Sequence, residues 1–390
     1  MLDEHQPASG PLAGIVVADF SRVLAGPYAT MMLGDLGATV IKVESPLGDD
    51  TRTWKPPVLN DQATYYLSVN RNKKSVQLDL KDSRDRVRAR RLARTADILV
   101  ENFMPGTLIR YGLDYETVAL DNPSIVYGTI TGFGDEKGRE LPGYDLVVQA
   151  VSGLMSITGP KDDMPYKSGV AVVDVLTGLH LAVAVLAALD LRSRTGVGQH
   201  VSVNLLGAAL ASMVNQSASY LATGISPTRM GNAHPSLFPY EPLKTMDGYL
   251  VVAIGNDAQF RRFCDALNVA ALAEDVRFST NQQRVVNRET LKPLIEERLA
   301  SDSASNWSKI LINFKVPCGP INSIGEGVAL AQNLGLDPIV QLIDSHGVAT
   351  PSITNPLSFS NTPPTYRYAP PRQDENGDEI RGWLDSLSDE

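Results

Sequence analysis

Short runs of β-branched and aliphatic residues alternate with helix-like segments through the first part of the chain. The strand-like runs lie at 14–20, 39–44, 75–80, 96–103 and 124–134. Between them, 26–38 has apolar residues at helical spacing, with Pro27 near the helix start, and 82–95 has the pattern of a charged helix. This alternation predicts an α/β domain with a mainly parallel sheet.

One carboxylate, Asp174, interrupts an otherwise apolar stretch. Residues 168–173 are strand-like and a helical pattern begins at Leu176, so we expect Asp174 at a strand-to-helix junction. Ligands bind at the carboxyl edge of the strands in open α/β sheets. The pattern alone leaves two explanations of Asp174 about equally open, a helix N-cap and an active group.

The second half of the chain indicates a smaller, separate unit. Residues 204–224 form a long helical stretch with the character of a spacer, and a loop rich in proline and glycine follows at 226–241. The later pattern predicts a strand at 249–255 and helices around 257–268, 287–300 and 305–314.

The composition argues against several classes of partner. A formal net charge of −9 disfavours broad nucleic-acid or membrane binding. Cys264 and Cys318 are far apart in sequence and fit a reducing compartment. Residues 1–10 lack the features of a signal peptide, and the longest charge-free apolar stretch, 181–189, is too short to span a bilayer. We therefore expect a cytoplasmic protein without nucleic-acid or membrane partners.

Common cofactor and catalytic motifs are missing from the sequence. The loop after the first predicted strand, SRVLAGP (21–27), is not a dinucleotide fingerprint, and neither a Walker A loop nor a G-x-S-x-G elbow occurs. None of the five histidines has a second ligand at zinc-site spacing. Carboxylates remain as the candidate nucleophile or base.

Other polar and aromatic features have structural as well as functional explanations. His180 lies within the predicted helix, where a structural role is favoured over a catalytic one. The basic segment VNRNKKS (69–75) can hold phosphates or form a solvated turn, and the turn is favoured. Trp54 and Tyr65 can be ordinary core aromatics.

Several long segments follow one another in an order typical of one enzyme family. They are DFSRVLAGPYATMMLGDLGATVIKVESPLGDDTRTW (19–54), YYLSVNRNKKSVQLDLKD (65–82), ADILVENFMPGTLIRYGL (96–113), PGYDLVVQAVSGLMSITG (142–159) and SGVAVVDVLTGLHLAVAVLAAL (168–189). The match continues through RTGVGQHVSVNLL and VPCGPINS. Over roughly residues 11–365 the chain resembles the family III CoA-transferases, also called the CaiB/BaiF type.

The resemblance implies an α/β fold with a Rossmann-like large domain, a smaller α/β domain and an interlocked, ring-like homodimer. The corresponding boundaries are 1–203 for the N-terminal part of the large, CoA-binding domain, 204–225 for a linker helix, 226–325 for the small domain, and 326–390 for a return linker and the C-terminal part of the large domain.

The resemblance also implies transfer of CoA from an acyl-CoA such as succinyl-CoA to a carboxylic acid such as a dicarboxylate. Asp174 matches the family's catalytic aspartate, which forms a mixed anhydride and then an aspartyl-CoA thioester. Oxyanion and substrate contacts fall on Gly231, Asn232, Tyr144, Trp54 and Tyr65. CoA contacts fall on Val23, Leu24, Ala25, Leu78, Asp79, Leu80, Lys81, Asn102, Phe103, Met104 and Arg110. Coenzyme A enters as a substrate, and neither a permanently bound cofactor nor a metal is implied.

Two positions depart from the pattern of some family members. Those members have glutamine at the position of Leu24 and arginine at the position of Ser45. The first difference argues against oxalate as a substrate. The second removes one expected CoA contact, for which Arg71 or Lys74 is a candidate replacement.

Two other functions remain as alternatives. The α-methylacyl-CoA racemases have a related fold and use a His–Asp pair as opposed bases, but Tyr144 occupies the expected histidine position. A non-catalytic acyl-CoA-binding protein is the second alternative, and it predicts that Asp174 is dispensable.

Overall fold

The structure is a computed structural model that describes residues 9–387 and divides into two compact units. Unit 1 comprises Met1–Leu154, Ser168–Ile225 and Asp337–Glu390. Unit 2 comprises Met155–Lys167 and Ser226–Leu336. Unit 1 is therefore assembled from three stretches of chain, which precede, separate and follow the two stretches of unit 2.

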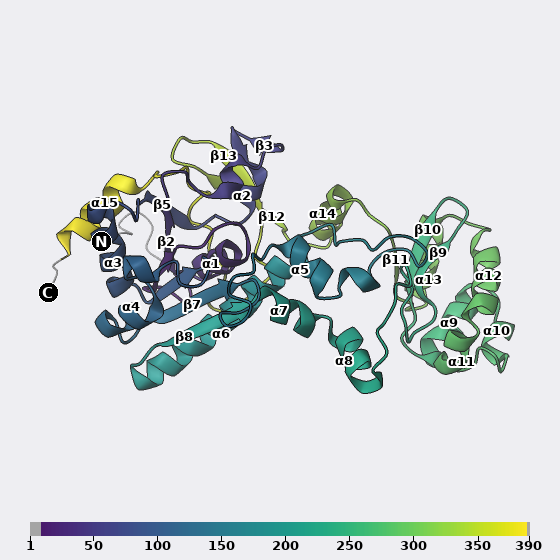
Figure 1. Cartoon of the computed structure of the whole chain (residues 1–390). Helices are drawn as coiled ribbons and strands as arrows, with labels where there is room; N and C mark the ends of the chain where they lie inside the picture. The colour runs from purple at the N-terminus through teal and green to yellow at the C-terminus, as the bar shows by residue number, and fades with distance from the viewer. Residues whose placement is uncertain (1–8, 388–390) are drawn as a thin grey trace. The chain divides into compact units, whose positions relative to one another are not determined.

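A six-stranded sheet lies at the centre of unit 1 (Figure 1). Its strands, in spatial order, are β5 (Lys73–Gln77), β2 (Thr39–Glu44), β1 (Val16–Asp19), β6 (Ile98–Glu101), β7 (Val126–Thr131) and β8 (Gln199–Asn204). Every neighbouring pair is parallel, which confirms the predicted α/β fold. Because successive strands are added outward in both directions from β1 and β6, the loops after these two strands meet at the carboxyl edge, where such sheets bind ligands.

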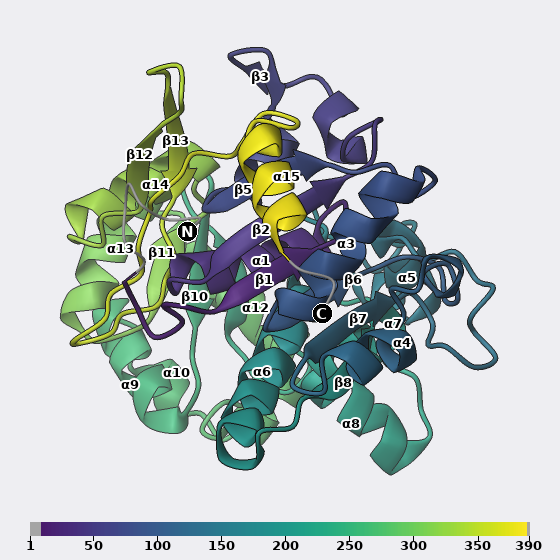
Figure 2. The same ribbon diagram turned by 90° about the vertical axis from the view of Figure 1, so that its left-hand side faces the viewer.

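Helices cover both faces of this sheet (Figures 1 and 2). One face packs on α1 (Ala25–Asp35), α6 (Val172–Thr195) and α7 (Leu205–Ser212). The other packs on α3 (Ser83–Thr95), α4 (Tyr115–Asp121) and α15 (Gly377–Ser386). An apolar core lies on each face of the sheet, and alternate residues of one strand point into the two cores. Val17 belongs to the first core and Ala18 to the second. Burial on both faces explains why the central strands β1 and β6 are apolar up to their last residue.

The outer edge of β5 is covered by the C-terminal segment of the chain. The backbone N–H of Ser75 donates to the side chain of Asn376 at 3.0 Å, and that of Gln77 donates to Asp374 at 2.7 Å. The adjoining helix α15 packs on β5 and α3 (Figure 2). Its residue Asp385 pairs with Arg88 at 2.6 Å. Residues from the far end of the sequence thus satisfy hydrogen-bonding groups of an edge strand.

Helix α6 is the most apolar long helix in residues 9–387. It is the one helix of this part of the chain that is long and apolar enough to cross a membrane by length and composition. The helix packs closely on α1, β7 and β8, and a Cβ added at Gly178 would lie 2.5 Å from the carbonyl oxygen of Ala25. Its packing within unit 1 buries 44% of this apolar stretch.

Unit 2 contains a three-stranded antiparallel sheet in the order β11-β10-β9. Its strands and helices are β9 (Tyr240–Lys244), β10 (Tyr249–Ala253), α9 (Asp257–Ala266), α10 (Ala271–Glu274), α11 (Asn281–Val286), α12 (Arg288–Leu299), α13 (Ala304–Asn313), β11 (Cys318–Pro320) and α14 (Ile324–Asn333). Phe238, Phe263 and Trp307 are among the residues of its own apolar core. The predicted strand and helices of this region are confirmed.

The remaining elements of unit 1 are short. They are β3 (Val58–Leu59), β4 (Gln62–Ala63), α2 (Thr64–Ser68), α5 (Asp145–Val151), α8 (Val214–Thr223), β12 (Ile339–Ile343) and β13 (Ala349–Ile353). The single helix predicted over 204–224 is two helices, α7 and α8, which are separated where Val214 has a φ of 38°. A β-branched residue at positive φ does not continue a helix.

The strand predicted over 168–173 is wrong. Residues 168–171 are irregular, and α6 begins at Val172 rather than at Leu176. Asp174 therefore stands in the first turn of the helix and not at a strand end. The apolar run 170–173 forms no strand and instead enters the helix, whose start is fixed by a carboxylate from elsewhere in the sequence.

Candidate active site

Asp174 lies on α6 directly beside the first residue of α5, Asp145. One oxygen of the Asp145 carboxylate accepts the backbone N–H groups of Val173 at 2.8 Å and Asp174 at 3.2 Å. Its other oxygen accepts the side-chain amide of Gln149 at 2.6 Å. Asp145 therefore satisfies N–H groups that the first turn of a helix leaves free. It fixes both the start of α6 and the position of Asp174.

The carboxylate of Asp174 is itself uncompensated. Within unit 1, no described donor hydrogen-bonds it and no cation pairs with it. Burial raises the pKa of Asp174 to about 7, and the neighbouring charge of Asp145 adds to the shift. The N-cap explanation of Asp174 is therefore wrong, because Asp145 performs that role. What remains is a partly buried carboxyl group without a structural partner, which is the profile of a functional residue.

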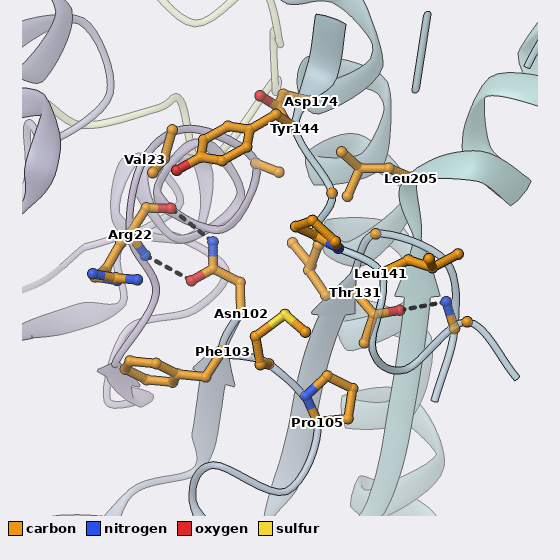
Figure 3. Close-up of a pocket in the computed structure, with 18 of the residues that line it drawn as sticks. Arg22, Val23, Asn102, Phe103, Pro105, Thr131, Leu141, Tyr144, Asp174 and Leu205 are labelled. Carbon is orange, nitrogen blue, oxygen red and sulfur yellow. Dashed lines mark hydrogen bonds between the residues drawn. The ribbon is translucent and has the colours of Figure 1, made fainter. Parts of the chain in front are cut away.

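Asp174 and Tyr144 line a cavity of about 270 Å³ in unit 1 (Figure 3). The loops after β1 and β6 form much of its wall. They contribute six of the residues predicted to contact CoA: Val23, Leu24, Ala25, Asn102, Phe103 and Met104. The cavity therefore lies at the carboxyl edge of the sheet, at the point where its winding changes direction.

A reciprocal hydrogen-bond pair joins the two loops. The Asn102 side chain accepts the backbone N–H of Arg22 at 2.9 Å and donates to the carbonyl oxygen of Arg22 at 2.7 Å (Figure 3). The carboxylate of Glu101 accepts the backbone N–H of Phe103 at 2.8 Å, and burial raises the pKa of Glu101 to about 7. These contacts fix the backbone on both sides of Asn102.

A buried ion pair holds the backbone of the loop after β1 in place through hydrogen bonds. Lys42 and Asp49 are fully buried and lie 2.8 Å apart. Lys42 also donates to the carbonyl oxygen of Ser21 at 3.1 Å, and Asp49 accepts the N–H of Val23 at 3.4 Å. Burial alone would raise the pKa of Asp49, but Lys42 and the donors of Thr51 outweigh it and lower the pKa to about 2.

Val23, the residue held by this pair, has a φ of 71°. This left-handed conformation is unfavourable for a β-branched side chain, typically by about 1–3 kcal/mol. Strain of this kind persists where the surrounding structure enforces it, often at binding sites. The sequence offered no indication of it.

The other predicted CoA contacts line a second cavity of about 370 Å³ in unit 1. Leu78, Asp79, Leu80, Lys81 and Arg110 all belong to it. Arg22 and Phe103 line both cavities, so the two adjoin. One cavity presents the uncompensated Asp174, and the other presents Lys81 and Arg110. The predicted CoA contacts thus form one extended surface, although they come from distant parts of the sequence.

Trp54 and Tyr65 pack against each other beside the site. Their ring centroids lie 4.9 Å apart at an interplanar angle of 71°, an edge-to-face contact. Burial raises the pKa of Tyr65 to about 12, and the charges of Asp174, Asp145 and Asp49 contribute further. Tyr65 thus lies near enough to Asp174 for the charge of that carboxylate to raise the pKa of the tyrosine hydroxyl. Neither aromatic residue lines the cavity that contains Asp174.

Gly231 and Asn232 belong to unit 2. Gly231 has a φ of 63°, and its N–H donates to the carbonyl oxygen of Gly159 at 3.1 Å. Glycine tolerates this conformation without a steric penalty. The oxyanion role of Gly231 and Asn232 stays a prediction.

The basic segment 69–75 is neither a solvated turn nor a phosphate site. Arg71 pairs with Asp35 at 2.6 Å, Lys73 with Asp19 at 3.0 Å and Lys74 with Glu379 at 2.9 Å. All three cations are buried. Burial lowers the pKa of Lys73 to about 8 in spite of Asp19. Arg71 and Lys74 are already paired, and neither lines the second cavity, to which Ser45 belongs.

His180 makes a local contact within its own helix, and the structural role favoured for it stays a prediction. Its Nδ1 lies 2.8 Å from the carbonyl oxygen of Leu176, one turn earlier in the same helix. In residues 9–387 no group of three or more His, Cys, Asp or Glu side chains is arranged to hold a metal ion.

Asp145, Asp49 and Lys42 were missed by sequence reasoning as contributors to the site. Asp145 follows Tyr144 directly, but no spacing in the sequence links it to a helix that begins at Val172. Asp49 and Lys42 act through the backbone of a loop that precedes them. Only the fold brings these groups together.

The sequence and fold are similar to those of known proteins. A family model described as CoA-transferase family III matches residues 12–377. The succinate–glutarate CoA-transferase of Agrobacterium fabrum is 42% identical over 385 residues, which cover 97% of this chain and 96% of that protein. The succinyl-CoA:glutarate CoA-transferase of Mus musculus is 45% identical over 326 residues, which cover 83% of this chain and 75% of that protein. The crystal structure of a CAIB/BAIF family protein from Brucella suis has a TM-score of 0.85 at 41% identity, covering 96% of this chain and 100% of that chain.

Proposed function

The chain belongs to CoA-transferase family III, as its sequence predicted, and we propose that it transfers CoA from succinyl-CoA, or a similar acyl-CoA, to a dicarboxylic acid through covalent intermediates on Asp174. The observation that carries this mechanism is the Asp174 carboxylate, which is partly buried, unpaired within unit 1 and exposed to a cavity. A nucleophile needs lone pairs that are not already engaged by donors.

The reaction consists of four acyl transfers. The Asp174 carboxylate attacks the thioester carbonyl of the donor, forming a mixed anhydride and releasing CoA thiolate. The thiolate attacks the aspartyl carbonyl of the anhydride, which gives an aspartyl-CoA thioester and frees the donor acid. The acceptor carboxylate then attacks this thioester, forming a second anhydride and releasing the thiolate again. Attack of the thiolate on the acceptor acyl carbonyl yields the new acyl-CoA and regenerates Asp174.

The surrounding residues have supporting roles in this scheme. Lys81 and Arg110 bind phosphates of CoA in the second cavity, while the loops at 23–25 and 102–104 hold the part of CoA that reaches Asp174. Gly231 and Asn232 stabilise the oxyanions, and Tyr144, Trp54 and Tyr65 contact the acyl group. Limited access of water around Asp174 protects the anhydrides from hydrolysis.

The substrate class is supported by the relatives. Those from Agrobacterium fabrum and Mus musculus carry names that specify succinate or succinyl-CoA together with glutarate. A donor and an acceptor that are both short dicarboxylates would use the same acyl subsite in turn. We further propose that the protein acts in the cytoplasm as a homodimer of interlocked subunits.

Chemical trapping tests the mechanism. The protein is mixed with succinyl-CoA, treated with hydroxylamine or borohydride, digested and analysed by mass spectrometry. We expect the modification on Asp174 and its absence from Asp174→Asn. Modification at another residue, or near-native turnover by Asp174→Ala, would contradict the mechanism. Exchange of the α-proton of a 2-methylacyl-CoA with solvent deuterium, without CoA transfer, would instead indicate a racemase.

A further inference from the structure

Two arginines, Arg22 and Arg139, line the cavity that contains Asp174. They differ in how many neighbouring groups interact with the guanidinium. Arg22 lies 3.2 Å from the carboxylate of Asp50, and its guanidinium lies 5.5 Å from the centre of the Phe103 ring. Arg22 also lines the second cavity, with Lys81 and Arg110. It therefore belongs to the side of the site that receives CoA.

Arg139 has far fewer partners. Its Nε lies 3.5 Å from Glu140, whose side chain is 86% exposed, so this contact is weak. Within unit 1, no described acceptor engages either terminal nitrogen of its guanidinium. Arg139 shares the first cavity with Asp174 and Tyr144 and also lines a third cavity of about 320 Å³, but it does not line the second. It presents an available cation to the same space as the nucleophile.

The loop that carries Arg139 is closed tightly at its base. A Cβ added at Gly143 would lie 2.4 Å from the Cα of Gly132, so the two ends of the loop are in direct contact. The N–H of Gly134 donates to Thr131 at 3.0 Å, and that of Leu141 donates to the carbonyl oxygen of Gly138 at 3.0 Å. A loop held in this way reduces the entropy that a ligand contact must offset.

We propose that Arg139 binds the distal carboxylate of a dicarboxylic acyl group and so selects dicarboxylates over monocarboxylates. The inference rests on the proposed function, because it names the residue that recognises the proposed substrate class. One carboxyl group of a short dicarboxylate reacts at Asp174, and the other needs a cation in a protein whose formal net charge is −9. A guanidinium matches a carboxylate in a bidentate geometry.

A pair of donors that differ only in the distal carboxylate provides the test. Succinyl-CoA and butyryl-CoA have acyl chains of the same length and carry the same CoA, so they separate acyl recognition from CoA recognition. Initial rates are measured for both donors with a common monocarboxylate acceptor. The variants are Arg139→Met, Arg139→Lys and Lys137→Met. Lys137 is the matched control, since it is an exposed cation of the same loop that does not line the cavity.

We expect Arg139→Met to lower kcat/KM for succinyl-CoA by about 10- to 100-fold, as for loss of a charge-assisted hydrogen bond. The value for butyryl-CoA should change by less than about twofold on the same reasoning. Arg139→Lys should fall between wild type and Arg139→Met, and Lys137→Met should match wild type. Equal losses with both donors would assign Arg139 to CoA binding, and no loss with succinyl-CoA would exclude any role. Either result overturns the inference.

The wild-type protein tests the proposed function separately. If it transfers CoA from butyryl-CoA but not from succinyl-CoA, the proposed substrate class fails before any variant is considered, and the inference fails with it. If the wild type accepts both donors and Arg139→Met retains full activity with succinyl-CoA, only the inference fails.

Discussion

The carboxylate of Asp145 accepts the backbone N–H of Asp174 at 3.2 Å, so one acid fixes the position of the other without engaging its side chain. The two carboxylates differ in the hydrogen bonds that they accept. Asp145 receives hydrogen bonds from Val173, Asp174 and Gln149, whereas the Asp174 carboxylate receives none within unit 1. The arrangement holds the main chain of the nucleophile still and leaves its oxygens available.

Replacing Asp145 by asparagine should shift the pH dependence of the reaction. The asparagine side chain would retain an oxygen that accepts the two N–H groups but would lack the negative charge. Because that charge adds to the effect of burial in raising the pKa of Asp174, the pKa should fall and the acid limb of the kcat/KM profile should move to lower pH. An acid limb that stays in place or moves to higher pH would contradict this account of the pair.

Asp145→Ala serves as the comparison for that prediction. It removes the charge and the helix cap together, so it should also lower the free energy of unfolding by about 1 kcal/mol. Denaturant unfolding gives the free energy of unfolding of Asp145→Asn and Asp145→Ala at one pH. The difference between the two values measures the contribution of the helix cap without that of the charge.

Asp174 should destabilise the fold as the pH rises. Its pKa is about 7 in the folded protein against an ordinary value of 3.8, so the folded state holds this proton more tightly than the unfolded state. The stabilisation by the neutral form is complete below about pH 4 and is lost as the pH rises through about 7. Asp174→Asn should therefore be more stable than wild type at pH 8, by at most about 4 kcal/mol, with the difference vanishing near pH 4. Urea unfolding at both pH values measures this, and a difference that does not depend on pH would refute it.

Asp49 should control affinity for acyl-CoA through Val23. Asp49→Asn weakens the support of the strained loop and leaves Lys42 without its buried partner, which typically costs about 3–5 kcal/mol. We expect KM for acyl-CoA to rise by about tenfold as preorganisation is lost, with kcat per folded molecule little changed. Trapping stoichiometry on Asp174 gives the concentration of folded molecules.

Asp35→Asn is the matched control for that variant. Asp35 belongs to another buried pair, with Arg71, that does not contact the loop after β1. The Asp35→Asn variant should lower the free energy of unfolding to a similar extent and leave KM for acyl-CoA unchanged. A similar rise in KM in both variants would mean that general destabilisation, rather than the loop, is responsible.

Gly178 should be required where α6 crosses α1. A Cβ at this position would lie 2.5 Å from the backbone carbonyl oxygen of Ala25, so Gly178→Ala must push the helices apart. We expect a loss of about 1–3 kcal/mol in the free energy of unfolding, typical of overpacking. Gly382→Ala on α15 is the control, because nothing lies within 4 Å of its added Cβ and the change should be neutral or stabilising.

The sequence predicted those parts of the fold that depend on local pattern. The strands β1, β2, β6 and β7, the second half of β5 and the helices α1 and α3 are each recognisable from their own residues, because periodicity follows burial on one or both faces. The strand predicted at 168–173 is wrong because the same apolar pattern suits either state. The carboxylate of Asp145, distant in sequence, selects the helix.

The resemblance predicted many of the residues that line the two cavities, but it did not predict the distant charges that hold their loops in place. The segment 69–75 had the character of a solvated turn because its partners Asp35, Asp19 and Glu379 are remote in sequence. The strained Val23 is likewise invisible in the sequence, since its conformation depends on a buried ion pair that forms only in the fold.

The contacts of Asn376 and Asp374 with the edge of β5 have a consequence for biosynthesis. During translation β5 emerges some three hundred residues before the groups that complete it, as the sequence separations of 301 and 297 show. Until then its free N–H groups are open to pairing with other chains. The edge of the central sheet can therefore reach its protected state only after residues 374–376 have been synthesised, whereas most of unit 2, residues 226–336, is one continuous stretch that is synthesised earlier. The edge of β5 is thus open to aggregation with other chains from its own synthesis until residues 374–376 have been added.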